Sequence, residues 1–188
     1  MNAFRLSDQE LGQNHMTTPA ESEAWLLHED TVCREDRRDR LAWLASMLPR
    51  AEYLTFPGGL MANFLFEEMR YCFTYGQFLA TIALGFAYIE RTLAAKFFAA
   101  GRNDLERAGI RRLLQEARDH GILTADEVEE LDRIRRTRNP VAHFRKPLAQ
   151  DSIELRSFRE DLHPYDVLEQ DARAVIQAAM ESLAKDVF

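Results

Sequence analysis

The sequence predicts an all-α protein, a four- to five-helix antiparallel bundle. Apolar residues recur at intervals of three and four along most of the chain from about residue 31. No segment alternates convincingly between apolar and polar residues with a period of two, which is the pattern of a half-buried strand. Proline and glycine mostly separate the periodic segments, as expected where helices end.

Length and composition are those of a soluble globular domain. The 188 residues are 46% hydrophobic and 29% charged, which is ample for a core. The formal charge of −7 argues against a protein that coats nucleic acid by bulk charge, so any contact with nucleic acid must be local.

Cysteine usage and apolar runs indicate the compartment. Cys33 and Cys72 lack metal-type spacing, and the N-terminal residues lack the apolar core of a signal peptide, so we expect a reduced, cytoplasmic protein. The longest apolar run, residues 78–89, has 12 residues. That run is too short to cross a bilayer, and we expect a buried helix and no membrane association.

We expect two parts in the chain. Residues 1–30 are polar and acidic, which favours a flexible tail with one short helix near Trp25. Residues 31–188 form a single helical domain. Its first helix covers about residues 35–48 and ends at Pro49, and a turn follows at residues 57–59.

A long helical stretch is expected over about residues 60–100, with a break near Tyr71 as one option and Gly101 as its stop. Its second half carries two adjacent seams. The bulky seam contains Leu79, Ile82, Phe86, Ile89, Leu93 and Phe97, and the small seam contains Gly76, Ala80, Ala83, Ala87, Glu90 and Ala94. Glu90 is the only charge on either seam. Small side chains allow another helix to approach closely, either inside the bundle or across a dimer interface.

Three further helices complete the expected domain. One covers about residues 104–120 and stops at Gly121. The next begins at the capping-box sequence of Thr124 to Glu127 and ends or kinks at Asn139, because Pro140 follows. Residues 144–163 are expected to be a long connection, and a last helix covers about residues 165–185.

One segment, residues 133–146, is locally positive. It has six basic residues and no acidic one: Arg133, Arg135, Arg136, Arg138, Arg145 and Lys146. A solvated basic face explains most of them. Arg138 differs, because it lies four residues after Ile134 on the apolar stripe, where a buried guanidinium needs a partner. Glu90 is the candidate partner.

This segment resembles the signature of HEPN domains, in which an arginine and a polar residue are followed a few positions later by a histidine. Arg138, Asn139 and His143 match that pattern. Residues 85–93, GFAYIERTL, are similar to the family's long upstream helix with its acidic residue, and an alanine-rich helix closes the chain. The resemblance covers about residues 60–188.

The resemblance implies an all-α bundle that forms a two-fold dimer with the two motifs in a cleft near the axis. Many HEPN domains are metal-independent endoribonucleases, often toxins or defence effectors, and others bind nucleotides or partners without cleavage. Arg138, Asn139 and His143 would then be the catalytic residues, supported by Glu90, Arg135 and Arg145. The implied partners are RNA or a nucleotide, a second copy of the chain, and an antitoxin or a nucleotidyltransferase.

The residue types suit metal-free RNA cleavage on chemical grounds. Histidine transfers protons near neutral pH, and the planar guanidinium of arginine binds a phosphate through two hydrogen bonds. Asn139 can orient either group. A dimer supplies two copies of His143, one as base and one as acid. The sequence has no zinc-binding, phosphate-loop or dinucleotide motif, so we expect neither a metal nor a cofactor.

Three other interpretations remain open. A non-catalytic HEPN module would bind a nucleotide or a protein partner. A purely structural motif would consist of a helix-end arginine paired with Glu90 and a histidine that caps a turn. A DNA-binding regulator is weaker, because the basic segment runs into a proline instead of forming an exposed recognition helix.

Overall fold

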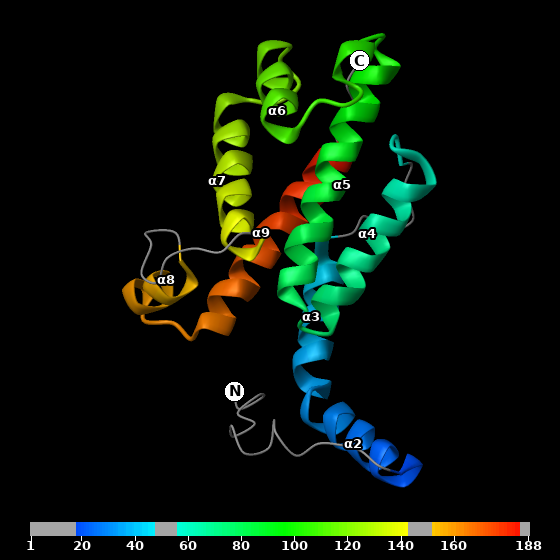
Figure 1. The fold of residues 1–188 in the computed structure, drawn as a ribbon, viewed down its shortest axis with the longest axis vertical. Coiled ribbons are helices and arrows are strands. Elements are labelled where there is room, and N and C mark those ends of the chain that lie inside the picture. Colours follow the sequence, from blue (N-terminus) through cyan, green and yellow to red (C-terminus); the bar gives the residue numbers. More distant parts are fainter. Residues whose placement is uncertain (1–17, 48–55, 143–151, 185–188) are drawn as a thin grey trace. The chain divides into compact units, whose positions relative to one another are not determined.

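The computed structural model describes residues 18–47, 56–142 and 152–184, and these ranges are helical with no strand (Figure 1). The all-α prediction is therefore confirmed. The chain divides into two compact units, residues 1–45 and residues 46–188.

The first unit contains α2 (Pro19–Val32) and most of α3 (Arg34–Met47). α2 begins with a capping box, in which the Glu21 amide donates to Thr18 Oγ1 and the Glu21 carboxylate accepts from the Thr18 amide. It confirms the expected helix near Trp25, and α3 confirms the one expected over residues 35–48. The rest of the expected tail, residues 1–17, lies outside the described residues.

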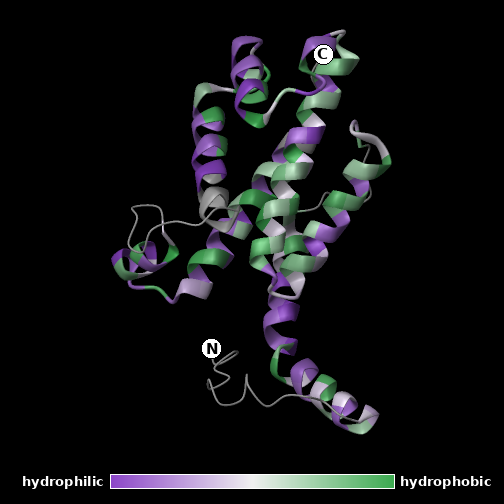
Figure 2. Ribbon diagram, viewed as in Figure 1, coloured by the Kyte–Doolittle hydropathy of each residue, from purple (hydrophilic) through white to green (hydrophobic). Residues whose placement is uncertain are grey.

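The core of the second unit is formed by α4 (Gly59–Thr74), α5 (Phe78–Ala99) and α9 (Pro164–Ala184). Figure 2 shows hydrophobic residues concentrated on these helices, whereas α7 is mostly hydrophilic. Five of the six members of the bulky seam are buried: Ile82, Phe86, Ile89, Leu93 and Phe97. Leu79 is 45% exposed, so the seam's first position was predicted wrongly.

α5 and α9 approach each other closely at Gly85. A Cβ atom at this position would clash with the side chain of Val175 and lie 3.0 Å from Met69 Sδ. Gly85 is therefore required by packing against two helices and not by backbone conformation. Burial of the α5 faces toward α4 and α9 supplies most of the apolar contact of the unit.

The long helical stretch is broken at residues 75–77, a few positions after Tyr71. Gly76 adopts φ +75°, and the amides of Gly76 and Gln77 donate to the carbonyls of Phe73 and Cys72. This is the usual glycine-centred end of a helix. The Tyr165 hydroxyl donates to the Gly76 carbonyl at 2.8 Å and ties the start of α9 to this turn.

The helix expected over residues 104–120 is shorter than predicted. A 3-10 turn, η1 (Asn103–Leu105), is followed by α6 (Ile110–Asp119), which begins after Gly109. The buried stripe of α6 consists of Ile110, Leu113, Leu114 and Ala117. The predicted start was wrong because the chain leaves helical geometry after η1, and Gly109, the N-cap of α6, is extended with φ −70° and ψ 160°.

The connection expected over residues 144–163 contains a helix. α8 (Ile153–Glu160) begins at Ser152, whose hydroxyl accepts from the Leu155 amide at 3.2 Å. It ends at Asp161, which has φ 52°. With α8 and the division of the long stretch, the described chain from α3 onward has seven α-helices, more than the four to five expected.

Candidate functional site

The predicted site lies on α7 (Ala125–Ala142), whose start follows directly from the sequence. The Thr124 amide donates to the Glu127 carboxylate at 2.8 Å, and the Glu127 amide donates to Thr124 Oγ1 at 3.3 Å. The predicted capping box is therefore confirmed.

The helix does not end at Asn139. α7 continues through Pro140 to Ala142, so Arg138 and Asn139 belong to its last turns. Pro140 has no N–H to donate to the carbonyl of Arg136, but the residues around it keep helical geometry. Proline disfavours α geometry in the preceding residue without forbidding it. Of the two outcomes predicted at Asn139, an end or a kink, the end was therefore wrong.

Two of the six predicted site residues have described side chains. These are Glu90 and Arg135, and they form neither a hydrogen bond nor an ion pair with each other. The side chains of Arg138 and Asn139, and the whole of His143 and Arg145, lie outside the described residues. The pairing of Glu90 with Arg138 stays a prediction.

The three described arginines of the basic segment pair with carboxylates of the preceding turn. Arg133 lies 2.7 Å from Glu130, and Arg135 and Arg136 each lie 2.7 Å from a different oxygen of Asp132. The spacings are i,i+3 and i,i+4, which the sequence contains and which our count of charge over residues 133–146 missed. The segment is therefore less positive than its own composition indicates.

These ion pairs also lower the pKa values of the two carboxylates. Hydrogen bonding from Arg133 lowers the pKa of Glu130. Burial acts to raise the pKa of Asp132, but hydrogen bonds from Arg135 and Arg136 overcome it and the pKa is lowered. Both carboxylates are therefore held in the charged form that the arginines require.

The exposure of the three arginines differs. The Arg135 side chain is only 13% exposed, whereas those of Arg133 and Arg136 are 52% and 71% exposed. Arg135 acts as a packing and positioning group of α7, while Arg133 and Arg136 remain accessible to a ligand.

Glu90 is half-buried on α5, in a hollow of about 690 Å³ between α4, α5 and the segment after η1. Its charged neighbours there are Arg91, Glu106 and Arg107, and the Arg91 side chain donates to the Gly58 carbonyl at 2.9 Å. Ala83 and Ala87, on the same small seam, are exposed. At these positions the small seam therefore lies on the surface and not inside the bundle.

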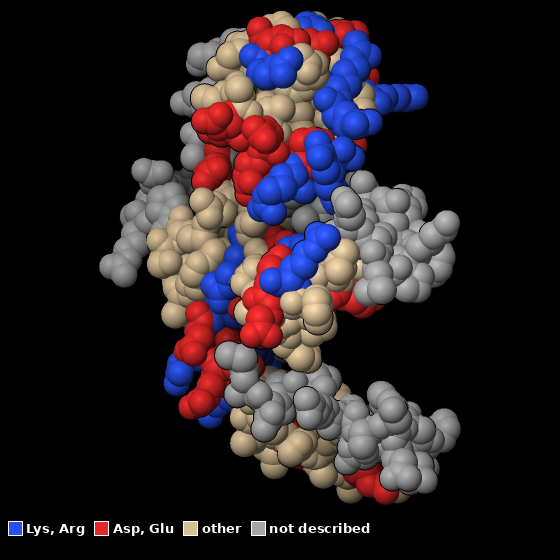
Figure 3. All heavy atoms as spheres, turned by 90° about the vertical axis from the view of Figure 1, so that its left-hand side faces the viewer, with Lys and Arg blue, Asp and Glu red and all other residues tan. Residues whose placement is uncertain are grey.

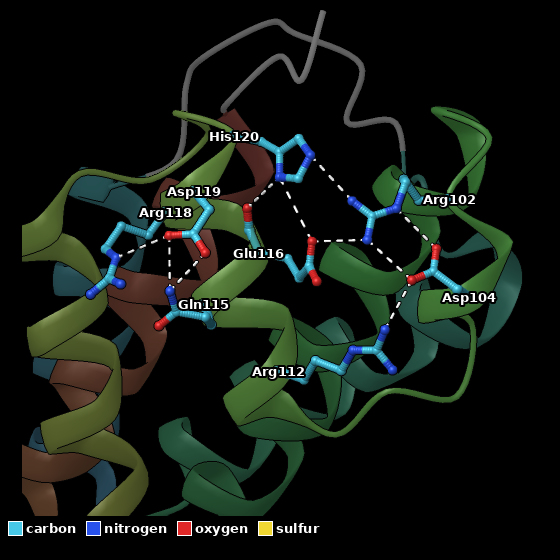
Figure 4. Close-up of polar contacts among 8 residues, drawn as sticks. All are labelled: Arg102, Asp104, Arg112, Gln115, Glu116, Arg118, Asp119 and His120. Carbon is cyan, nitrogen blue, oxygen red and sulfur yellow. Dashed lines mark hydrogen bonds and ion pairs between the residues drawn. The ribbon is translucent and has the colours of Figure 1, made fainter.

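A second charged cluster, which sequence reasoning missed, surrounds Arg102 (Figure 4). The Arg102 guanidinium donates to Asp104 at 2.9 Å and to Glu116 at 2.9 Å, and Arg112 reaches Asp104 from α6. Hydrogen bonding with Arg102 lowers the pKa of Asp104. The cluster fixes η1 against α6.

His120, at the end of α6, also contacts this cluster (Figure 4). Its Nε2 lies 3.2 Å from an Arg102 nitrogen, and its Nδ1 lies 2.9 Å from the Glu116 carbonyl and 3.8 Å from the Glu116 carboxylate.

Neither a metal site nor a clear membrane segment emerges in the part of the chain that the structure describes. No group of three or more His, Cys, Asp or Glu side chains in it could hold a metal ion.

α5, with 22 residues, is the one described helix that is long and apolar enough to cross a membrane. Half of its most apolar 18-residue stretch is buried in the protein. A core helix of a soluble protein has the same properties.

Comparisons of the chain with protein-family models, with curated proteins and with solved structures found no match. The functional argument therefore depends on the residues of this chain alone.

Proposed function

We propose that this protein is a HEPN-like, metal-independent endoribonuclease of the toxin or defence type, acting as a two-fold dimer. The observation that carries the proposal is the position of the motif. Arg138 and Asn139 belong to the last turns of an 18-residue helix in an all-helical chain, and His143 is the next residue after that helix in the sequence.

The reaction requires a base, an acid and a cation at the scissile phosphate. One copy of His143 removes the proton from the ribose 2′-OH, and the 2′-oxygen attacks phosphorus. The bond from phosphorus to the 5′-oxygen breaks, and the partner's His143 protonates the leaving 5′-oxygen. The products are a 2′,3′-cyclic phosphate and a free 5′-OH, with no metal or redox step.

Arg138 would stabilise the negative charge that develops on the phosphoryl oxygens, because its guanidinium can donate two parallel hydrogen bonds. Asn139 would orient either the phosphate or the imidazole. Glu90 would hold Arg138 in place, and Arg135 and Arg145 would support the local positive charge. The tight pairing of Arg135 with Asp132 suits a positioning role better than direct contact with phosphate.

A second function, a HEPN module that binds a nucleotide or a protein partner without cleavage, is favoured by the neutralisation of the basic segment. Glu130 and Asp132 pair with three of its six basic residues and offset two of its six positive charges, so its attraction for a long polyanion is reduced.

Cleavage of mixed RNA in EDTA tests the first function. We expect wild-type protein to leave 2′,3′-cyclic phosphate ends, and His143→Ala and Arg138→Ala to lower the rate by at least about 100-fold, the typical contribution of general acid–base catalysis. Arg159→Ala, which replaces an exposed arginine of α8 outside the motif and the Glu90 hollow, is the matched control and should cleave normally. Intact RNA from a folded wild-type dimer would instead support the binding module.

A further inference from the structure

We propose that the groove between α6 and α7 holds the phosphate backbone of single-stranded RNA as it leads to the motif at the end of α7. This inference rests on the proposed function and adds a substrate-binding surface to it. The groove has a volume of about 850 Å³, and arginines from both helices line it: Arg111, Arg118, Arg133 and Arg136.

The arginines of the α6 wall are available to a ligand. Arg111 is exposed and forms no ion pair with any described residue. Arg118 lies 3.5 Å from Asp119, and both side chains are about half exposed. No acidic residue of α6 is among the described residues that line the groove.

The acidic residues of the groove come from α7 and are unevenly distributed along it. Asp126 and Glu129 lie near the start of the helix and pair with no described arginine. Further along, Glu130 and Asp132 are paired with Arg133 and Arg136. Patches of acidic and basic side chains adjoin one another on the face that carries these helices (Figure 3). The end of the groove further along α7 is therefore its more basic end.

The short connection between α6 and α7 determines which residues of the two helices lie at the same end of the groove. Residues 120–124 join the end of α6 to the start of α7, so the two helices pack as an antiparallel pair. Arg111, at the start of α6, then lies toward the part of α7 that carries Arg133 and Arg136. Since a helix rises 1.5 Å per residue, Arg136 precedes Arg138 by only about 3 Å along the axis. The basic end of the groove leads to the motif.

The existing ion pairs do not prevent phosphate binding. Arg133 and Arg136 are 52% and 71% exposed, and exposed pairs of this kind contribute only about 0–1 kcal/mol. A phosphate can replace one carboxylate contact, and it releases condensed counterions from the RNA at the same time. Glu130 and Asp132 would keep these arginines oriented when no RNA is bound.

Equilibrium binding of a fluorescent single-stranded RNA, followed by anisotropy over a range of salt concentrations, tests the groove. His143→Ala is the background, with EDTA present, so that the probe stays intact. We expect Arg111→Ala with Arg136→Ala to weaken binding roughly tenfold and to lower the slope of log K against log salt by about 0.7 per arginine.

The matched control is Arg34→Ala with Arg159→Ala, which removes the same charge from exposed positions outside the groove and the Glu90 hollow. Binding should be unchanged in this control. An equal loss in both pairs of variants, or no binding of RNA by the background protein, would overturn the proposal. Far-ultraviolet circular dichroism establishes that each variant keeps its helical content.

The outcomes separate this inference from the proposed function. If wild-type protein cuts no RNA but binding depends on Arg111 and Arg136, RNA binding by the groove is supported and the endoribonuclease function is contradicted. If wild-type protein cuts RNA and the groove variants bind and cut RNA as well as wild type, the endoribonuclease function is supported and RNA binding by the groove is contradicted.

Discussion

The second unit contains two regions that are stabilised in different ways. α4, α5 and α9 pack through buried aromatic and aliphatic side chains, with Phe66, Phe73 and Phe86 almost fully excluded from water. η1, α6 and α7 have a thinner buried stripe and carry partly exposed ion pairs on their outer surface, between η1 and α6 and within α7. The first region therefore supplies most of the stability of this unit, and the second region carries its accessible charged side chains.

The largest effect should come from breaking the first region. Phe86→Ala removes a ring that is 1% exposed, and we expect it to lower the free energy of unfolding by about 3–5 kcal/mol, measured by urea denaturation. Phe158→Ala is the control, since that ring is 85% exposed and its loss should change stability by less than about 0.5 kcal/mol. Equal effects of the two variants would show that the hydrophobic packing described for α5 is incorrect.

A buried ion pair should give an intermediate effect. Arg156 of α8 donates two hydrogen bonds to Asp171 of α9, at 2.6 and 2.9 Å, and Asp171 is 5% exposed. Asp171→Asn leaves Arg156 with only the more distant, partly exposed Glu160, at 3.6 Å, as an acidic partner, so we expect a loss of about 3 kcal/mol in the same urea experiment.

The control for this pair is Glu130→Gln, the same carboxylate-to-amide change in a pair whose two side chains are about half exposed. It should cost less than about 1 kcal/mol. A loss in Glu130→Gln as large as that in Asp171→Asn would contradict the contrast between buried and exposed charge.

The smallest effect should come from the Arg102 cluster, and it should depend on pH. The pKa of Asp104 is lowered in the folded protein, chiefly by its hydrogen bond with Arg102, so its stabilisation is present above the unfolded pKa and is lost as pH falls through the folded pKa. We expect Asp104→Asn to be less stable than wild type at pH 7, and the difference to shrink as the pH falls below about 4, the pKa of an aspartate in the unfolded chain, and to vanish at still lower pH.

Urea denaturation of both proteins across that range measures the difference. Because Asp104 is exposed, the loss at neutral pH should be smaller than that of Asp171→Asn. A difference that grows as the pH falls would show that the Asp104 carboxylate is not stabilised by Arg102.

The sequence predicts elements well where local rules decide them. The helices over α3 and α9 were predicted within about one residue at each end, because apolar spacing and flanking residues are local properties. The capping box at the start of α7 was also predicted, since both of its members lie within four residues.

Features that depend on distant partners were not predicted. Gly85 does not lie in a turn, so no local pattern marks it. Position 85 requires a residue without a side chain only because Val175 of α9 packs against it. The 3-10 turn η1 is joined to α6 by a charged cluster, and the pairing of Arg102 with Glu116 in that cluster spans 14 residues. α8 could have been found from Ser152 as an N-cap with Glu154 in the first turn.

The candidate site was predicted in part. The sequence placed Arg138 and Asn139 at a helix end, and α7 ends three residues after Asn139. The partners of Arg133, Arg135 and Arg136 were missed, although regular i,i+3 and i,i+4 spacing predicts them. The groove between α6 and α7 required the tertiary structure, because its two walls come from separate helices.

The packing of α9 against α5 has a consequence for biosynthesis. Gly85 packs against Val175, and the Tyr165 hydroxyl donates to the carbonyl of Gly76, 89 residues earlier. The core is therefore completed by contacts between residues that are far apart in sequence. At translation rates of about 5–20 residues per second, α4 and α5 emerge roughly 5–20 seconds before the segment that covers them. During that interval their apolar faces remain accessible to chaperones or to other nascent chains, and completion of this core depends on the synthesis of α9.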